Sequence, residues 1–283
     1  MRFPISVWAG YYKELRPDVV MDLYRQAGFT HMEWSQRHTE MLLPESTPEK
    51  VGKQVAAWAK ERDFSIPQGH LSFKGGICTE ERLEQLKKEV ELFQNAGITN
   101  AVLHANGGDE LPFEKRYDCW VENISRLCQY VKGTELTFCL ENLGSVPFTH
   151  WAANLLKLID DCGGENLGIC LDVGHLHMTN IRDGEQQSST EFIRTAGKRL
   201  RALHIHENNG KADDHQMPFS AKTGFDWKQL VRALEENQYS GIFNFETIGE
   251  SKNTPLAVRH EKLKYMRYLA EYMLSGEFVN SAE

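Results

Sequence analysis

Short β-branched or apolar runs alternate with longer amphipathic segments from one end of this sequence to the other. A strand, then a helix, then another strand predicts parallel pairing, because each helix returns the chain across the sheet. Eight repeats of this unit predict an α/β fold of the (β/α)8 type, an eight-stranded parallel TIM barrel with outer helices. The eight predicted strands are residues 3–8, 30–34, 64–70, 99–104, 136–141, 167–172, 201–206 and 241–246.

The helical segments show apolar residues at steps of three and four. Residues 80–96 are the clearest case, with Leu83, Leu86, Val90 and Phe93 on one face. Gly28 and Gly97 are predicted to end helices just before the next strand. After the sixth strand the pattern is weakest, because residues 183–189 are polar. The other predicted helices are residues 48–62, 113–132, 149–161, 226–237 and 259–274.

Bulk properties fit one globular domain covering residues 1–283, since no linker or low-complexity tract divides the chain. No apolar run approaches the roughly 18 residues of a membrane span, and the first residues lack a signal-peptide pattern. The net charge of -8 argues against a nucleic-acid partner, which usually demands a basic face. We therefore expect a cytoplasmic protein without a membrane or nucleic-acid partner. A homodimer is possible.

The six cysteines are scattered and form no Cys-x-x-Cys pair. Several lie inside apolar runs, such as Cys139 within residues 136–140. Reduced, buried thiols are therefore expected in preference to disulfides.

The residues that end the predicted strands are the most informative feature for function. Strand ends of a barrel meet at its C-terminal mouth, where active sites of this fold lie. Most strands deliver a histidine or a carboxylate there, and buried carboxylates this close would repel unless neutralised. A divalent cation is the simplest solution. The strand ends are Trp8, Glu33-Trp34, His70, His104, Glu141, Asp172, His204 or His206, and Glu246.

The ligand types narrow the choice of metal. Carboxylates with imidazoles and no thiolates suit manganese, magnesium, cobalt or zinc. Iron oxygenases usually combine two histidines with one carboxylate, and this set is richer in carboxylate.

Several motifs resemble those of the xylose-isomerase-like TIM barrel superfamily, which includes sugar and sugar-phosphate isomerases and epimerases and the abasic-site nuclease endonuclease IV. The resemblance covers nearly the whole chain. It is carried by Glu141-Asn142, Leu171-Asp172-Val173-Gly174-His175, Ala202-Leu-His-Ile-His-Glu-Asn208, Gly210-Lys-Ala-Asp-Asp-His215, Gly224-Phe-Asp-Trp227 and Gly241-Ile-Phe-Asn-Phe-Glu246.

The resemblance implies a metal site made by Glu141, Asp172, His204 and Glu246. Strand alternation places His204 and His206 on the same face, so either could be the ligand. His204 is preferred because the family ligand precedes an acidic residue by three positions, as His204 precedes Glu207.

The resemblance favours a sugar, keto-sugar or cyclitol isomerase or epimerase. The metal would hold a substrate carbonyl and hydroxyl and stabilise the enediolate, while Glu141 and Glu246 exchange the α-proton as base and acid. Glutamates on opposite faces of the sugar would give epimerisation. A one-sided arrangement would give aldose–ketose exchange or a dehydratase. His175 would bind a substrate hydroxyl or cap a helix, and Trp8, Trp34 and Phe73 would line the pocket or simply pack.

The alternative is a multi-zinc phosphodiesterase like endonuclease IV, with His70, His104, His175, Asp213 and His215 as extra ligands. Against it, Trp8-Ala9-Gly10 replaces the nuclease's Gly-Ala-His, and Ser220-Ala-Lys-Thr-Gly224 replaces its Gly-Glu-Gly. The acidic charge balance also fits DNA poorly. We therefore predict one metal per chain, with His70, His104, His175, His206, Asp213 and His215 as substrate contacts or, in the alternative, additional ligands. A barrel that binds a ligand without turnover is a third class, but it would be expected to lack one of the two glutamates.

The loops after the seventh and eighth strands predict an unphosphorylated substrate. Glu207, Asp213 and Asp214 there outnumber Lys211 and Lys222, and residues 249–252 contain one glycine. A substrate phosphate prefers a glycine-rich nest or clustered arginines.

Overall fold

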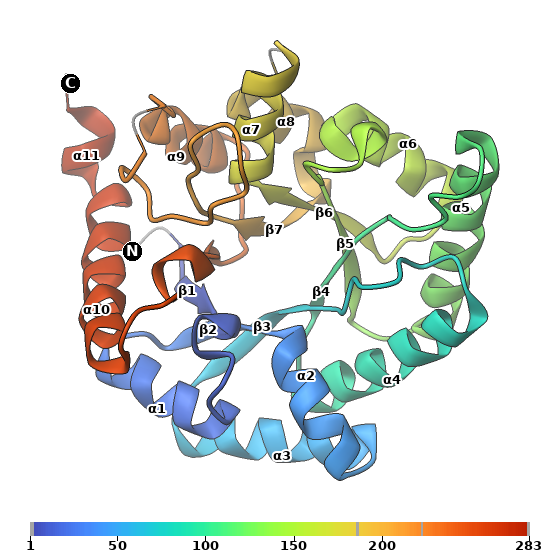
Figure 1. Ribbon diagram of the computed structural model, residues 1–283, viewed down its shortest axis with the longest axis horizontal. Helices are drawn as coiled ribbons and strands as arrows, with labels where there is room; N and C mark the ends of the chain where they lie inside the picture. The colour runs from blue at the N-terminus through green and yellow to red at the C-terminus, as the bar shows by residue number, and fades with distance from the viewer. Residues whose placement is uncertain (1–2, 185–186, 222, 282–283) are drawn as a thin grey trace.

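A computed structural model describes residues 3–184, 187–221 and 223–281 and confirms the predicted (β/α)8 barrel (Figure 1). Eight parallel strands follow one another in the order β7-β6-β5-β4-β3-β2-β1-β8. Each lies inside its predicted range, except that β7 begins one residue earlier. They are β1 (Ile5–Trp8), β2 (His31–Trp34), β3 (Ser65–His70), β4 (Asn100–Leu103), β5 (Thr137–Glu141), β6 (Leu167–Asp172), β7 (Leu200–His204) and β8 (Phe243–Phe245).

The sheet closes on itself between β7 and β8. The backbone N–H of Ile205 donates to the carbonyl of Asn244 at 2.8 Å, and the N–H of Glu246 donates to the carbonyl of Ile205 at 3.1 Å. On the other side of β8, Asn244 is in register with Ser6 of β1. All eight strand ends therefore surround one axis and point their C-terminal residues at one mouth.

The helices form the outer ring of Figure 1, and the predicted ones lie where they were expected. α4 has the predicted bounds, and Gly97 ends it with a φ of 79°, a left-handed conformation that favours glycine. The polar stretch after β6 separates two helices, α7 and α8. The main helices are α1 (Pro17–Gln26), α2 (Gln36–Leu42), α3 (Pro48–Glu61), α4 (Glu80–Ala96), α5 (Phe113–Tyr130), α6 (Ala152–Cys162), α7 (Val173–Asp183), α8 (Ser189–Ala196), α9 (Trp227–Glu236), α10 (Leu256–Met273) and α11 (Gly276–Asn280).

Two apolar regions stabilise the fold. The larger one fills the space between strands and helices and contains large side chains such as Trp120, Phe138 and Phe243. The smaller one is a cluster of four short side chains contributed by β4 to β7 and is separate from the first: Val102, Cys139, Cys170 and Ala202. The inside of the barrel also buries polar residues on β8 and β1 to β3, namely Ser6, Glu33, Gln68 and Asn244.

The cysteines differ in part from the expectation of six reduced thiols. Cys78, in the loop before α4, forms a disulfide with Cys119 of α5, with Cα atoms 5.8 Å apart. The pairing could not be predicted because it joins residues 41 positions apart that only the fold brings together. The other four cysteines are free, and burial raises the pKa of Cys128 and of Cys139 to about 12, so these thiols stay protonated. Among the described residues, no helix is long and apolar enough to cross a membrane.

The loops that follow β3 and β4 contact each other through glycines at the mouth of the barrel. The N–H of Ile77 donates to the carbonyl of Asn106 at 3.0 Å. Gly76 has a φ of 65°, and a Cβ there would lie 2.3 Å from the Cα of Gly107. Because the obstacle is backbone, it cannot move aside as a flexible side chain would.

We expect Gly76→Ala to destabilise the protein more than Gly75→Ala. Both residues have positive φ, so each substitution should cost about 1–2 kcal/mol for the left-handed backbone. Gly75 has open space around its Cβ position, whereas Gly76 should add roughly 1–3 kcal/mol of overpacking. Urea unfolding of both variants measures the difference. Equal losses would show that the two loops do not meet as described.

Candidate active site

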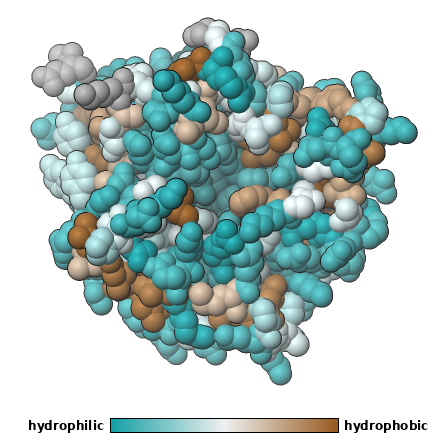
Figure 2. Space-filling view, viewed as in Figure 1, coloured by the Kyte–Doolittle hydropathy of each residue, from teal (hydrophilic) through white to brown (hydrophobic). Residues whose placement is uncertain are grey.

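All ten residues predicted for the site meet at the C-terminal mouth of the barrel. The space-filling view shows this mouth as a hollow lined mostly by hydrophilic residues (Figure 2). Contacts of 3.9 Å or less join the side chains into one connected cluster. Its members are His70, His104, Glu141, Asp172, His175, His204, His206, Asp213, His215 and Glu246.

The centre of the cluster is the Nδ1 atom of His204. Three carboxylate oxygens surround it: Glu246 Oε2 at 3.1 Å, Glu141 Oε1 at 3.6 Å and Asp172 Oδ2 at 3.6 Å. The nitrogen is buried and makes no hydrogen bond with any described residue. Ligand atoms about 2.0–2.2 Å from one ion lie roughly 3.0–3.6 Å apart, so the distances from Nδ1 to the three oxygens fit a divalent cation held by the four side chains.

The strands fix these four side chains directly. Glu141, Asp172 and His204 are the last residues of β5, β6 and β7, and Glu246 follows β8 at once. Asn142 locks two of the strands together, because its side-chain amide accepts from the backbone N–H of Asp172 at 2.7 Å and donates to its carbonyl at 2.9 Å. The four side chains are therefore carried by the closed sheet and not by flexible loops.

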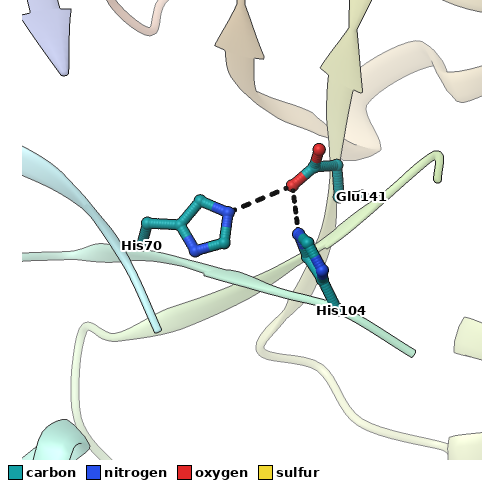
Figure 3. Close-up of side chains that lie close together, drawn as sticks. All are labelled: His70, His104 and Glu141. Carbon is teal, nitrogen blue, oxygen red and sulfur yellow. Dashed lines mark hydrogen bonds and ion pairs between the residues drawn. The ribbon is translucent and has the colours of Figure 1, made fainter. Parts of the chain in front are cut away.

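A second group shares Glu141 with the first (Figure 3). His70 Nε2 and His104 Nε2 both point at Glu141 Oε2, at 3.4 and 2.9 Å. Phe73 covers this pair, since its ring stacks on His104 with centroids 4.8 Å apart and meets His70 edge-on. The side chains of His70, His104 and Glu141 are also arranged so that they could hold a metal ion.

A third group lies on the other side of Asp172. The Nε2 atoms of His175 and His215 lie 3.3 and 3.0 Å from Asp213 Oδ2. His206 stacks on His215 with centroids 4.0 Å apart, and its Nε2 lies 3.0 Å from Asp172 Oδ1. The structure thus places His206 beside Asp213 and His204 beside Glu141, so the two histidines take different positions.

Burial and neighbouring charges shift the pKa values of the two site glutamates in opposite directions. Burial alone would raise the pKa of Glu141, but the charges of His104 and His204 hold it well below its usual range. For Glu246, burial raises the pKa and the nearby charge of Glu141 adds to the effect. Two carboxylates at one site therefore differ in their affinity for a proton.

Of the three aromatic residues considered for the pocket wall, Phe73 contacts the site histidines. Trp34 is fully buried, and its Nε1 donates to Thr39 of α2, so it packs in the outer layer. Trp8 is nearly buried and its ring lies against Gly10. Lys222, one of the two lysines counted in the loop after the seventh strand, lies outside the described residues.

Sequence reasoning noted Glu33 as a strand end but gave it no role. The structure buries it completely and surrounds it with His204, Gln68 and Asn244. Alternation along the strands could have indicated these partners, because Gln68 and Asn244 each stand two residues before a site residue. Asn244 also interrupts the apolar run Phe243–Phe245.

Comparison with known proteins agrees with the fold. Residues 21–269 match the model of a family described as xylose isomerase-like TIM barrel. Fructoselysine 3-epimerase of Shigella flexneri is 24% identical over 269 residues, 94% of this chain and 87% of that protein. Two solved structures share the fold. D-psicose 3-epimerase from Clostridium cellulolyticum H10, with D-tagatose, has a TM-score of 0.77 at 15% identity and covers 96% of this chain and 99% of its own. An L-ribulose 3-epimerase has a TM-score of 0.75 at 17% identity and covers 99% and 98%.

We expect a divalent ion such as Co²⁺ or Mn²⁺ to raise the melting temperature of chelator-treated protein. An ion that binds only the folded chain stabilises it by about 2.7 kcal/mol at one hundred times its Kd. Asp172→Asn should greatly reduce the shift, because the amide still caps α7 but loses the charge. Asp160→Asn, on the exposed face of α6, is the control and should keep it. Equal shifts in both variants would place the ion elsewhere.

Proposed function

The chain belongs to the xylose isomerase-like TIM barrel family, and from that premise we propose that it is a divalent-metal-dependent sugar epimerase or isomerase. One observation carries the proposal. Two buried glutamates, Glu141 and Glu246, approach the same imidazole nitrogen of His204 from strands three apart in the barrel order. They could therefore reach a bound substrate from different directions.

Glu141, Asp172, His204 and Glu246 would hold the metal ion in this proposal. The ion would supply Lewis acidity, which makes the hydrogen beside a substrate carbonyl easier to remove. One glutamate then takes the α-proton from one face of the sugar, and the other returns a proton to the opposite face. This exchange inverts the carbon. Return of the proton to a neighbouring carbon would instead interconvert an aldose and a ketose.

The histidines around the four proposed ligands would orient the substrate. Imidazole nitrogens of His70, His104 and His175 surround Glu141, and neutral imidazoles can donate hydrogen bonds to sugar hydroxyls. Phe73 would shield one side from water through its stacking on His104. The relatives named above are epimerases of fructoselysine, D-psicose and L-ribulose, which supports a ketose-like substrate for this chain.

We expect Glu246→Gln to fold normally but to lower proton exchange at least ~100-fold, because an amide cannot act as the base. Incubation of the enzyme and Mn²⁺ with a panel of ketoses and cyclitols in heavy water, followed by mass spectrometry, measures deuterium uptake. Glu89→Gln is the matched control. Glu89 is also a buried carboxylate, but it bonds to Ser72 and Gln85 and lies beside Arg82. Near-normal exchange by Glu246→Gln would refute the mechanism.

An unphosphorylated substrate is expected to be preferred over its phosphate ester. Acidic groups dominate the loops after β7 and β8, and Glu250 there already binds Lys262 at 2.7 Å. No cluster of arginines is available at these loops in the described part of the chain. Comparing kcat/KM for a ketose and its phosphate, at equal metal and ionic strength, tests this. A clear preference for the ester would overturn it.

A second candidate is a multi-metal phosphodiesterase, favoured by the two further groups around Glu141 and Asp213. Such an enzyme needs several ions because both the attacking water and the leaving oxygen must be stabilised. We expect one tightly bound metal per chain, measured by elemental analysis and anomalous scattering. Three ions together with cleavage of abasic duplex DNA would replace the epimerase by the nuclease. Three ions without cleavage would correct only the metal count.

A further inference from the structure

We propose that Glu33 of β2 is a positioning residue that fixes the tautomer and orientation of His204, so that Nδ1 faces the three site carboxylates. This role rests on the metal site proposed above. Glu33 is not one of the ten predicted site residues, and its recorded partners are His204, Gln68 and Asn244. It acts through His204.

Among the described residues, each side-chain partner of Glu33 is able to donate a hydrogen bond. Oε1 accepts from Gln68 Nε2 at 3.1 Å and faces His204 Nε2 at 3.0 Å, while Oε2 accepts from Asn244 Nδ2 at 2.5 Å. The amide of Asn244 is oriented by Ser6, whose hydroxyl donates to Asn244 Oδ1 at 2.6 Å. Because a carboxylate only accepts, the nitrogen of Asn244 faces Glu33 and its oxygen is left to accept from Ser6.

Glu33 fixes which nitrogen of His204 carries hydrogen when the proposed metal ion is bound. A carboxylate offers only lone pairs, so Nε2 donates to Glu33. Nδ1 faces three further carboxylates, and with the ion among them the neutral imidazole presents its Nδ1 lone pair to that ion. That lone pair lies 3.1–3.6 Å from one oxygen each of Glu141, Asp172 and Glu246, where a metal ion would need it.

Strand register explains why Glu33 cannot take a ligand position itself. Glu33 is level with Gln68 on β3, and His70, which reaches Glu141, stands two residues further along. Glu33 therefore belongs to the next layer down inside the barrel, together with Gln68 and Asn244. It is fully buried there, and a carboxylate behind a metal-binding histidine typically strengthens metal binding.

The test measures binding of Co²⁺ alone to chelator-treated protein, by competition with a fluorescent chelator and by the visible spectrum of the bound ion. Glu33→Gln keeps the shape but adds an amide NH₂ among donors, so Co²⁺ should bind about 10–100-fold more weakly with an altered spectrum. Glu33→Asp keeps the charge and should lose less affinity in the same direction. Glu89→Gln, a buried carboxylate outside the site, should keep wild-type affinity.

The possible outcomes separate the two proposals. A lower melting temperature with unchanged Co²⁺ affinity and spectrum in Glu33→Gln would give Glu33 a purely structural role and overturn the inference. If Glu33→Gln does not fold, wild-type affinity in Glu33→Asp would overturn it equally. Failure of the wild-type chain to bind Co²⁺ at all would remove the metal site, and the positioning role with it.

Discussion

The main physical constraint on this structure is the burial of three carboxylates together at the end of a closed barrel. Glu141, Asp172 and Glu246 are all nearly inaccessible to water, and charges in that position are costly unless they are paired. Imidazoles and backbone donors surround these three carboxylates. Around His204 Nδ1, however, three acidic oxygens face one nitrogen. A cation bound among these oxygens would balance this excess of lone pairs over donors.

Two kinds of side chain fill the interior of the barrel below the three carboxylates. Short apolar side chains from β4 to β7 fill one part, and a hydrogen-bonded polar layer from β8 and β1 to β3 fills the other. The polar layer joins strands at opposite ends of the sequence, because Ser6 bonds to Asn244 across 238 positions. Site residues at strand ends consequently inherit the rigidity of the closed sheet, which a site built on loops would lack.

Local patterns and long-range contacts differ in how far the sequence reveals them. The strands were predictable from apolar runs, and the site was predictable because barrel geometry gathers strand ends wherever the rest of the chain lies. The polar layer was only partly predictable: alternation places Gln68 and Asn244 one layer below site residues, but the contact between Glu33 and His204, 171 positions apart, follows only from the register of the barrel. The disulfide between Cys78 and Cys119 was missed for the same reason: spacing alone does not show which loops meet.

The surroundings of Glu141 and Glu246 differ in a way that bears on their roles in the proposed proton exchange. Glu141 faces four imidazoles, those of His70, His104, His175 and His204, which stabilise its charge. Glu246 is approached by two imidazoles, those of His204 and His215, and burial together with the nearby charge of Glu141 raises its pKa. The proposed inversion of a carbon needs one glutamate to be protonated while the other is deprotonated. Unequal surroundings favour such a difference.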